Sequence, residues 1–206
     1  MFKDRTEAGK LLAEALAKYK SEDVVVFALP RGGIETALPI AHSLNSPLDL
    51  IITRKIGHPL SPEYAIAAIA ENGDMVGNEN ELGQVDKDWL ENEKQKQKEE
   101  AKRRRKVYLK DRLPLSVDGK VVIIVDDGVA TGLTMRVAIL ELRHRNPKKI
   151  IVAVPVIAQD AALMIKDEVD ELVYLEPPEK FLSTVGAHYE MFPQVSDGEV
   201  IRLMHS

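Results

Sequence analysis

Long apolar runs alternate along the chain with segments in which apolar residues recur every three or four positions. Continuous apolar runs are typical of strands that are buried on both faces, and the wider spacing is typical of amphipathic helices. We therefore predict strands over 24–29, 48–52, 121–125, 150–154 and 172–175, and helices over 6–19, 34–44 and 133–143. Strands that alternate with helices predict an α/β fold with a mainly parallel sheet flanked by helices.

Residues 86–110 depart from this alternation because they are almost entirely charged or polar. Glu, Lys, Gln and Arg dominate the segment, which predicts a long exposed helix within an insertion over about 78–114. Apolar residues occur only near its ends, so Trp89, Leu90 and residues 107–109 are expected to pack while the middle faces solvent. We interpret the basic run 103–106 as a solvated helix face, with a nucleic-acid or partner contact as the alternative.

Composition narrows the class of protein. The 206 residues carry a formal net charge of −5, and the length suits a single domain over 1–206. We call its last part, about 177–206, the C-terminal hood. The acidic balance makes broad nucleic-acid binding unlikely on physical grounds. Cysteine is absent, which excludes disulfides, zinc–thiolate sites and cysteine nucleophiles and fits a reducing compartment. No apolar run approaches the roughly 20 residues of a membrane span, so we expect no membrane association and a cytoplasmic location.

The strongest chemical signal is VVIIVDDGVATGLT at 121–134, where a buried strand ends in Asp126 and Asp127. Ligands of open α/β sheets bind beyond the carboxyl ends of the strands. The loop 130–134 that follows, with Ala130, Thr131, Gly132, Leu133 and Thr134, offers backbone N–H groups, two hydroxyls and a helix start, which suit a phosphate. The paired carboxylates can accept hydrogen bonds from a sugar diol. The alternative is an acidic strand end followed by an ordinary loop.

Two further segments also lie where a predicted strand ends. LPRGG at 29–33 combines the charge of Arg31 with the backbone freedom of Gly32 and Gly33, although the segment by itself is better explained as a tight turn with a surface arginine. Arg54 and Lys55 follow the apolar run 48–52, and we predict that they end its strand, with a solvated basic strand end as the alternative to a binding role. Phe181, Tyr189 and Phe192 in the hood are candidates for stacking on a base, with core packing as the alternative.

These motifs together resemble those of the type I phosphoribosyltransferases, over roughly residues 24–176 with an interruption at the charged helix. In that family the acid pair holds the ribose hydroxyls of phosphoribosyl diphosphate (PRPP), and the ATG-x-T loop holds its 5′-phosphate. The resemblance assigns Arg31, Gly32, Gly33, Arg54 and Lys55 to pyrophosphate, and Glu71 to a position near the reacting centre. For Glu71 the favoured alternative is an exposed glutamate beside a turn, because Asn72 stands where the family has an aromatic residue. Gly128 stands where the family usually has an aliphatic residue.

The resemblance implies an enzyme that joins a nitrogenous base to PRPP and releases pyrophosphate, with Asp126, Asp127, Arg54 and Glu71 as catalytic residues. Mg²⁺ is the implied cofactor, held by Asp126 and Asp127 directly or through water, and a homodimer is the implied assembly. The acceptor, a nucleobase or nucleotide, stays undefined. One alternative is a regulatory protein that binds PRPP or a nucleotide without catalysis. Another is a different enzyme class on the same fold, such as a PRPP-forming synthetase or a nucleotide hydrolase.

Overall fold

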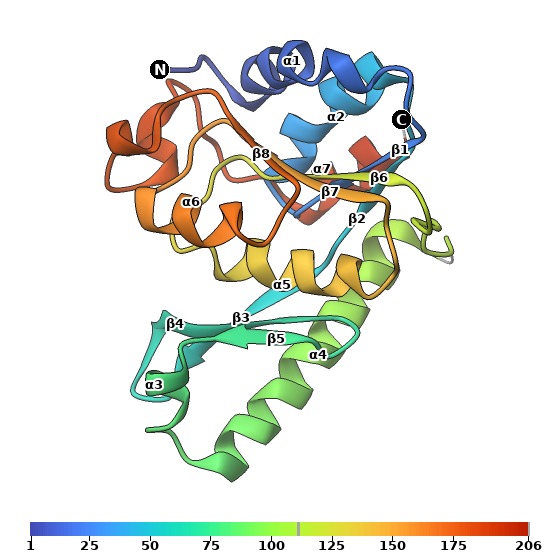
Figure 1. Ribbon diagram of the computed structural model, residues 1–206. Coiled ribbons are helices and arrows are strands. Elements are labelled where there is room, and N and C mark those ends of the chain that lie inside the picture. The colour runs from blue at the N-terminus through green and yellow to red at the C-terminus, as the bar shows by residue number, and fades with distance from the viewer. Residues whose placement is uncertain (111, 206) are drawn as a thin grey trace.

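The computed structural model describes residues 1–110 and 112–205; positions 111 and 206, which fall in the predicted insertion and hood, lie outside the described residues. A five-stranded parallel sheet with the strand order β2-β1-β6-β7-β8 forms the centre of the molecule (Figure 1). Its strands are β1 (Val24–Ala28), β2 (Leu48–Leu50), β6 (Val121–Val125), β7 (Lys149–Val154) and β8 (Glu171–Tyr174). The ends of each strand lie within two residues of the ends of a predicted run, and neighbouring strands pair in parallel. The predicted parallel α/β sheet is therefore confirmed.

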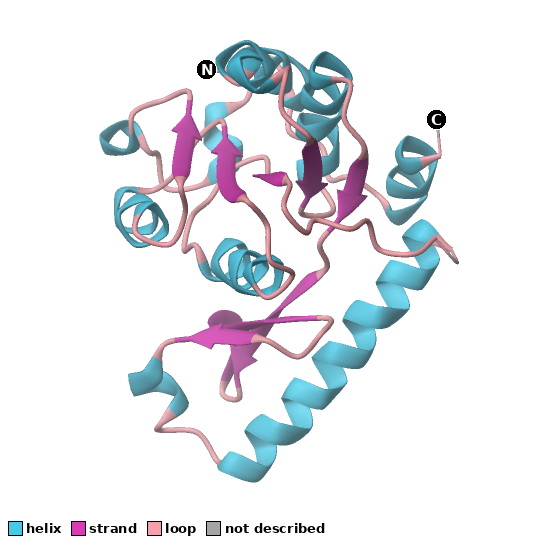
Figure 2. Ribbon diagram, turned by 45° about the vertical axis from the view of Figure 1, so that its right-hand side comes forward, coloured by secondary structure: helices cyan, strands magenta, loops and turns pink. Residues whose placement is uncertain are grey.

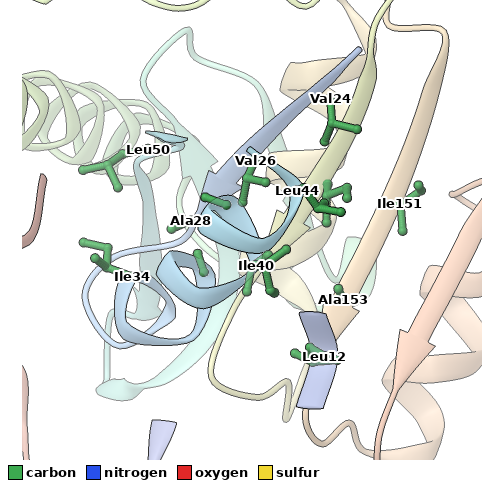
Figure 3. Close-up of a cluster of buried hydrophobic side chains, with 14 of the residues drawn as sticks. Leu12, Val24, Val26, Ala28, Ile34, Ile40, Leu44, Leu50, Ile151 and Ala153 are labelled. Carbon is green, nitrogen blue, oxygen red and sulfur yellow. The ribbon is translucent and has the colours of Figure 1, made fainter. Parts of the chain in front are cut away.

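Helices cover both faces of this sheet, which explains why its strands are continuously apolar. On one face lie α1 (Arg5–Ala15), α2 (Gly33–Leu44) and α7 (Asp197–Met204), and on the other α5 (Leu133–Arg143) and α6 (Gln159–Lys166). Side chains alternate between the faces along each strand. Val24, Val26 and Ala28 of β1 pack toward α1 and α2 (Figure 3), whereas Val25 and Phe27 pack toward α5.

A second, three-stranded antiparallel sheet follows β2, and the hydrophobic pattern did not predict it. It consists of β3 (Thr53–His58), β4 (Ser61–Ala70) and β5 (Met75–Gly77) in the order β3-β4-β5. Arg54 and Lys55 lie inside β3, so the prediction that they end the preceding strand is wrong. The strand β2 ends at Leu50, and the chain passes to the new sheet within three residues.

The charged segment forms α4 (Lys87–Leu109), a 23-residue helix that runs past both sheets after the short α3 (Glu79–Leu82) (Figure 2). The predicted helix is confirmed, but the expectation that its middle faces solvent holds for one side of the helix only. Ala101 is fully buried in the same cluster as Tyr108 and Leu109, whereas Val107 is 38% exposed. One side of the helix therefore belongs to the protein core despite its charged composition.

Three short 3₁₀ segments complete the chain: η1 (Ala17–Tyr19), η2 (Pro178–Lys180) and η3 (Val185–His188). The hood ends in α7, where Ser196 and Glu199 form a capping box. Within the described residues, no helix is both long enough and apolar enough to span a membrane.

Candidate active site

Two loops meet at the carboxyl edge of the parallel sheet because β1 and β6 are hydrogen-bonded neighbours in register. Ala28 pairs with Val125, so the loop after Ala28 and the loop after Val125 start side by side. A cavity of about 430 Å³ lies beyond them. It is lined by Leu29, Pro30, Arg31, Gly32, Thr53, Arg54, Lys55, Arg104, Asp126, Asp127, Gly128, Val129, Ala130, Thr131, Gly132, Thr134 and Val185. Most residues of the three motifs predicted from the sequence thus line one cavity.

The two carboxylates on the cavity wall differ in their partners. Asp126 Oδ1 accepts a hydrogen bond of 2.8 Å from the backbone N–H of Asp127. Asp127 Oδ2 accepts one of 2.7 Å from Nε of Arg5, whose side chain is buried. Burial and the neighbouring Asp127 charge raise the pKa of Asp126 well above its usual range. Burial also raises the pKa of Asp127, while the bond to Arg5 acts in the opposite direction.

Arg5 is a component of the site that the sequence analysis missed. Its guanidinium also donates to the carbonyl of Pro193 at 2.7 Å and lies over the ring of Phe192, 3.7 Å from the ring centre. Tyr189 donates to the carbonyl of Asp127 at 2.6 Å, so the N-terminal helix and the hood both fix Asp127. Arg5 and Asp127 are 122 positions apart, and no periodicity connects them, so the sequence carried no signal for this pair.

Gly32 is required by close packing between the two loops. A Cβ atom on Gly32 would lie 1.9 Å from Oδ2 of Asp127, and one on Gly33 would lie 2.9 Å from the carbonyl oxygen of Val125. The peptide bond between Pro30 and Arg31 is cis. Gly32 lines the cavity, whereas Gly33 begins α2 behind it. The glycine pair thus brings the backbone of this loop against the acid pair.

The loop before α5 has the shape expected of a phosphate cradle. Gly132 caps the helix with φ of 80°, a left-handed conformation that favours glycine. Ala130, Thr131, Gly132 and Thr134 line the cavity, while Leu133 turns away and packs in the cluster around Val137. The N-terminus of α5 adds positive potential here.

Cationic side chains converge on the cavity from different elements. Arg31 comes from the first loop, Arg54 and Lys55 come from β3, and Arg104 comes from α4. Arg54 donates to Oε1 of Gln97 at 3.0 Å, and burial together with the nearby Arg104 lowers the pKa of Arg54. The interpretation of 103–106 as a purely solvated face therefore fails for Arg104. The residues on both sides of Arg104 are also basic, so the sequence did not indicate which of them faces the cavity.

Glu71 does not lie in this cavity. It stands after the last residue of β4 and forms an ion pair of 3.5 Å with Arg105. Burial raises the pKa of Glu71. Its neighbourhood includes Glu141, whose side chain is 1% exposed and accepts a hydrogen bond from Arg145. The position of Glu71 after β4 thus places it beside α5, away from the acid pair.

We expect Glu141→Gln to stabilise the protein above neutral pH. Burial, and to a lesser degree the charge of Glu71, raise the pKa of Glu141 from 4.5 to about 7 despite Arg145 and Arg105. The unfolded chain therefore releases this proton at lower pH than the folded chain does, so the free energy of unfolding falls as pH rises from about 4.5 to 7. The substitution removes that loss, a gain of up to about 3 kcal/mol at pH 8.

Urea denaturation at pH 5 and pH 8 measures this effect. Glu199→Gln, a change of an exposed carboxylate that caps α7, serves as the comparison. A Glu141→Gln protein with the same pH slope as the parent would contradict the assignment.

The aromatic residues of the hood pack on one another rather than lining the cavity. The rings of Tyr189 and Phe192 stack with centres 4.9 Å apart, and the ring of Phe181 lies 5.3 Å from that of His188. The hood contributes Val185 to the cavity instead. A Cβ atom on Gly128 would lie 2.5 Å from Val185 Cγ1. A side chain at position 128, where the family usually has an aliphatic residue, would therefore clash with Val185, and glycine leaves the space that the hood occupies.

Comparison with known proteins identifies the family. Residues 4–190 match the model of the phosphoribosyl transferase domain. The chain belongs to this family, as its parallel sheet and its loops at the carboxyl ends of β1 and β6 indicate. Two curated relatives from strains of Mycobacterium tuberculosis, "Putative phosphoribosyl transferase MT0597" and "Putative phosphoribosyl transferase Rv0571c", are each 38% identical over 99% of this chain. The chain spans 46% of the length of these relatives.

Two solved structures share the fold of this chain. The protein TT1426 from Thermus thermophilus has a TM-score of 0.83 and 38% sequence identity, with 99% of this chain and 97% of that chain covered. The AQ2163 protein from Aquifex aeolicus has a TM-score of 0.52 at 14% identity, covering 83% of this chain and 73% of that chain, which shows a shared fold alone. The alignment with the Thermus protein spans almost the whole of both chains, so it includes α4 and the hood.

Proposed function

We propose that the protein transfers the 5-phosphoribosyl group of PRPP to a nitrogenous base and releases pyrophosphate. The observation that carries this proposal is a single cavity lined by an acid pair, a glycine–threonine loop and several cations. Each set matches one part of PRPP: the ribose diol, the 5′-phosphate and the diphosphate. The family of the chain supports the same reaction class.

The arrangement suggests how PRPP would lie in the cavity. The backbone N–H groups and hydroxyls of loop 130–134 would hold the 5′-phosphate at the start of α5. Asp126 and Asp127 would accept hydrogen bonds from the ribose hydroxyls. Arg31, Arg54 and Lys55 would balance the charge of the diphosphate, which places C1′ between the acids and the cations.

The transfer step follows from these positions. The bond between C1′ and the diphosphate oxygen breaks, and pyrophosphate takes the electron pair. A bond forms between C1′ and a nitrogen of the base, which gives up its proton to solvent. The two carboxylates favour the positive charge that develops on the ribose, and the cations favour the negative charge on the leaving group. No covalent intermediate with the protein is needed, because positioning and electrostatics lower the barrier.

The acid pair also suits a magnesium ion that enters with its substrate. Within the described residues, no cluster of three or more Asp, Glu, His or Cys side chains forms a closed metal site. Two adjacent carboxylates at an open cavity wall nevertheless fit Mg²⁺, which keeps several waters and takes further oxygens from phosphates. Asp126 and Asp127 would hold the ion, which would neutralise charge on the diphosphate.

The proposal predicts that Asp126→Asn combined with Asp127→Asn weakens PRPP binding by tenfold or more, since a hydrogen bond to a charged group is worth about 1.5–3 kcal/mol. Isothermal titration with PRPP and Mg²⁺ measures the affinity, and circular dichroism checks the fold. Asp160→Asn, an exposed acid on α6, is the matched control. Unchanged affinity in a folded double variant would refute the assignment of the acids.

A further inference from the structure

A second cavity, of about 720 Å³, lies on the other side of α4 from the candidate active site. It is bounded by the C-terminal half of α4, the C-terminal end of α5 and the turn after β4, which lie side by side in Figures 1 and 2. Arg104 lines the first cavity and Arg105 lines the second. Consecutive residues point about 100° apart on a helix, so one helix forms a wall of both cavities.

The inner wall of the second cavity, together with the fully buried Asp49 next to it, holds more carboxylates than guanidinium groups. Arg105 pairs with Asp49 at 3.3 Å and with Glu71 at 3.5 Å, and Arg145 pairs with Glu141. Three carboxylates therefore face two guanidinium groups. Asp49 is also satisfied by the backbone N–H groups of Leu50 and Leu115. Glu71 and Glu141 thus share the shortage of positive partners, in agreement with the raised pKa of each carboxyl.

Glu71 and Glu141 each keep one buried oxygen without a hydrogen-bond partner, Oε2 in both cases. Both residues line the cavity, and the Glu141 side chain is almost completely buried. A buried carboxylate oxygen without a partner is costly, and in a native protein it points to a missing donor. The inner wall is therefore built to receive N–H or O–H donors.

The rim of the same cavity has the opposite character. Lys102, Lys106, Lys110 and Arg112 surround the opening. Within the described part of the chain, Lys106 and Lys110 form no ion pair, while Lys102 pairs with Glu99 and Arg112 donates to the carbonyl of Leu48. Two lysines beside an open cavity suit the oxygens of a phosphate group.

We propose that this second cavity binds a phosphorylated ligand that also carries neighbouring N–H donors, the chemistry of a nucleotide with an amino-bearing base. The base would donate to Glu71 and Glu141 on the inner wall, and its phosphates would meet Lys106 and Lys110 at the rim. An inorganic anion is a poorer match, because it would supply no hydrogen-bond donors to Glu71 and Glu141. An inorganic cation is also a poorer match, because the lysines at the rim would repel it. The site is independent of the proposed transfer reaction.

Guanosine 5′-diphosphate and inorganic pyrophosphate are suitable probes, because they share the phosphates and only the nucleotide has N–H donors. Titration calorimetry on the full chain uses an Arg54→Ala/Asp127→Asn/Thr131→Val background. These changes remove a contact from each of the three subsites proposed for the first cavity, so binding that remains reports on the second. We expect Lys106→Gln combined with Lys110→Gln to weaken both probes about tenfold or more. Glu141→Gln is expected to weaken the nucleotide by a similar factor while leaving pyrophosphate binding unchanged or stronger.

A loss of nucleotide affinity in Glu141→Gln without a loss of pyrophosphate affinity separates this site from a general basic surface. Equal loss of both probes, or no nucleotide binding in the background variant, would overturn the proposal. Binding of a short single-stranded RNA that depends on Lys106 and Lys110, without binding of the mononucleotide, would also overturn it in favour of a nucleic-acid surface. Circular dichroism of each variant confirms that the fold is retained, and Lys166→Gln on α6 is the control for a loss of positive charge.

Discussion

Replacing Arg54 with alanine is expected to lower pyrophosphate-releasing turnover by about a hundredfold or more while changing the affinity for a nucleoside monophosphate little. The pyrophosphate leaving group gains negative charge in the transition state, and Arg54 faces the cavity from β3 beside Lys55. A monophosphate lacks that leaving group, so its binding does not depend on the same contact. Arg31→Ala should show the same asymmetry, because Arg31 lines the cavity from the opposing loop.

The measurement pairs turnover with each nucleobase in turn, read as pyrophosphate release, with the dissociation constant of the matching monophosphate. Arg202→Ala, an exposed change on α7, controls for the loss of a positive charge. If the two variants lose monophosphate affinity as severely as turnover, Arg31 and Arg54 do not form the pyrophosphate site. If the parent binds PRPP but turns over with no base, the protein is a PRPP sensor and not a transferase.

Gly32→Ala is expected to abolish most of the activity, with a loss of about a hundredfold or more, although it adds a single methyl group. The new Cβ would lie 1.9 Å from Oδ2 of Asp127 and 2.9 Å from Nε of Arg5. Either the loop or the carboxylate must move, and misplacing a group that positions substrate by about 1 Å can cost a hundredfold in rate. The loss should appear in turnover and in PRPP affinity together.

Gly198→Ala in α7 is the matched control, since the nearest atom to its new Cβ is 3.9 Å away and alanine favours a helix. Thermal unfolding of both variants shows whether the Gly32 effect is local. A Gly32→Ala protein with parental turnover would mean that the contact between Gly32 and Asp127 has no role in the reaction.

The sequence by itself determined the parallel sheet and the contents of its two loops. The apolar runs 24–29 and 121–125 can be buried only on both faces, which requires helices on each side. The family resemblance assigned Arg31 and Asp127 to one site, and the pairing of β1 with β6 in the folded chain brings both residues to one cavity.

The tertiary structure alone decided which charged residues reach the site. Glu71 was placed near the reacting centre by its position in the chain, yet the second sheet carries it to Arg105 on the far side of α4. Arg5 reaches Asp127 and Arg104 reaches the cavity through contacts that no local pattern encodes. Hydrophobic periodicity reports which face of an element is buried, but it is silent about polar side chains. Their partners are set by long-range packing, which only the folded chain reveals.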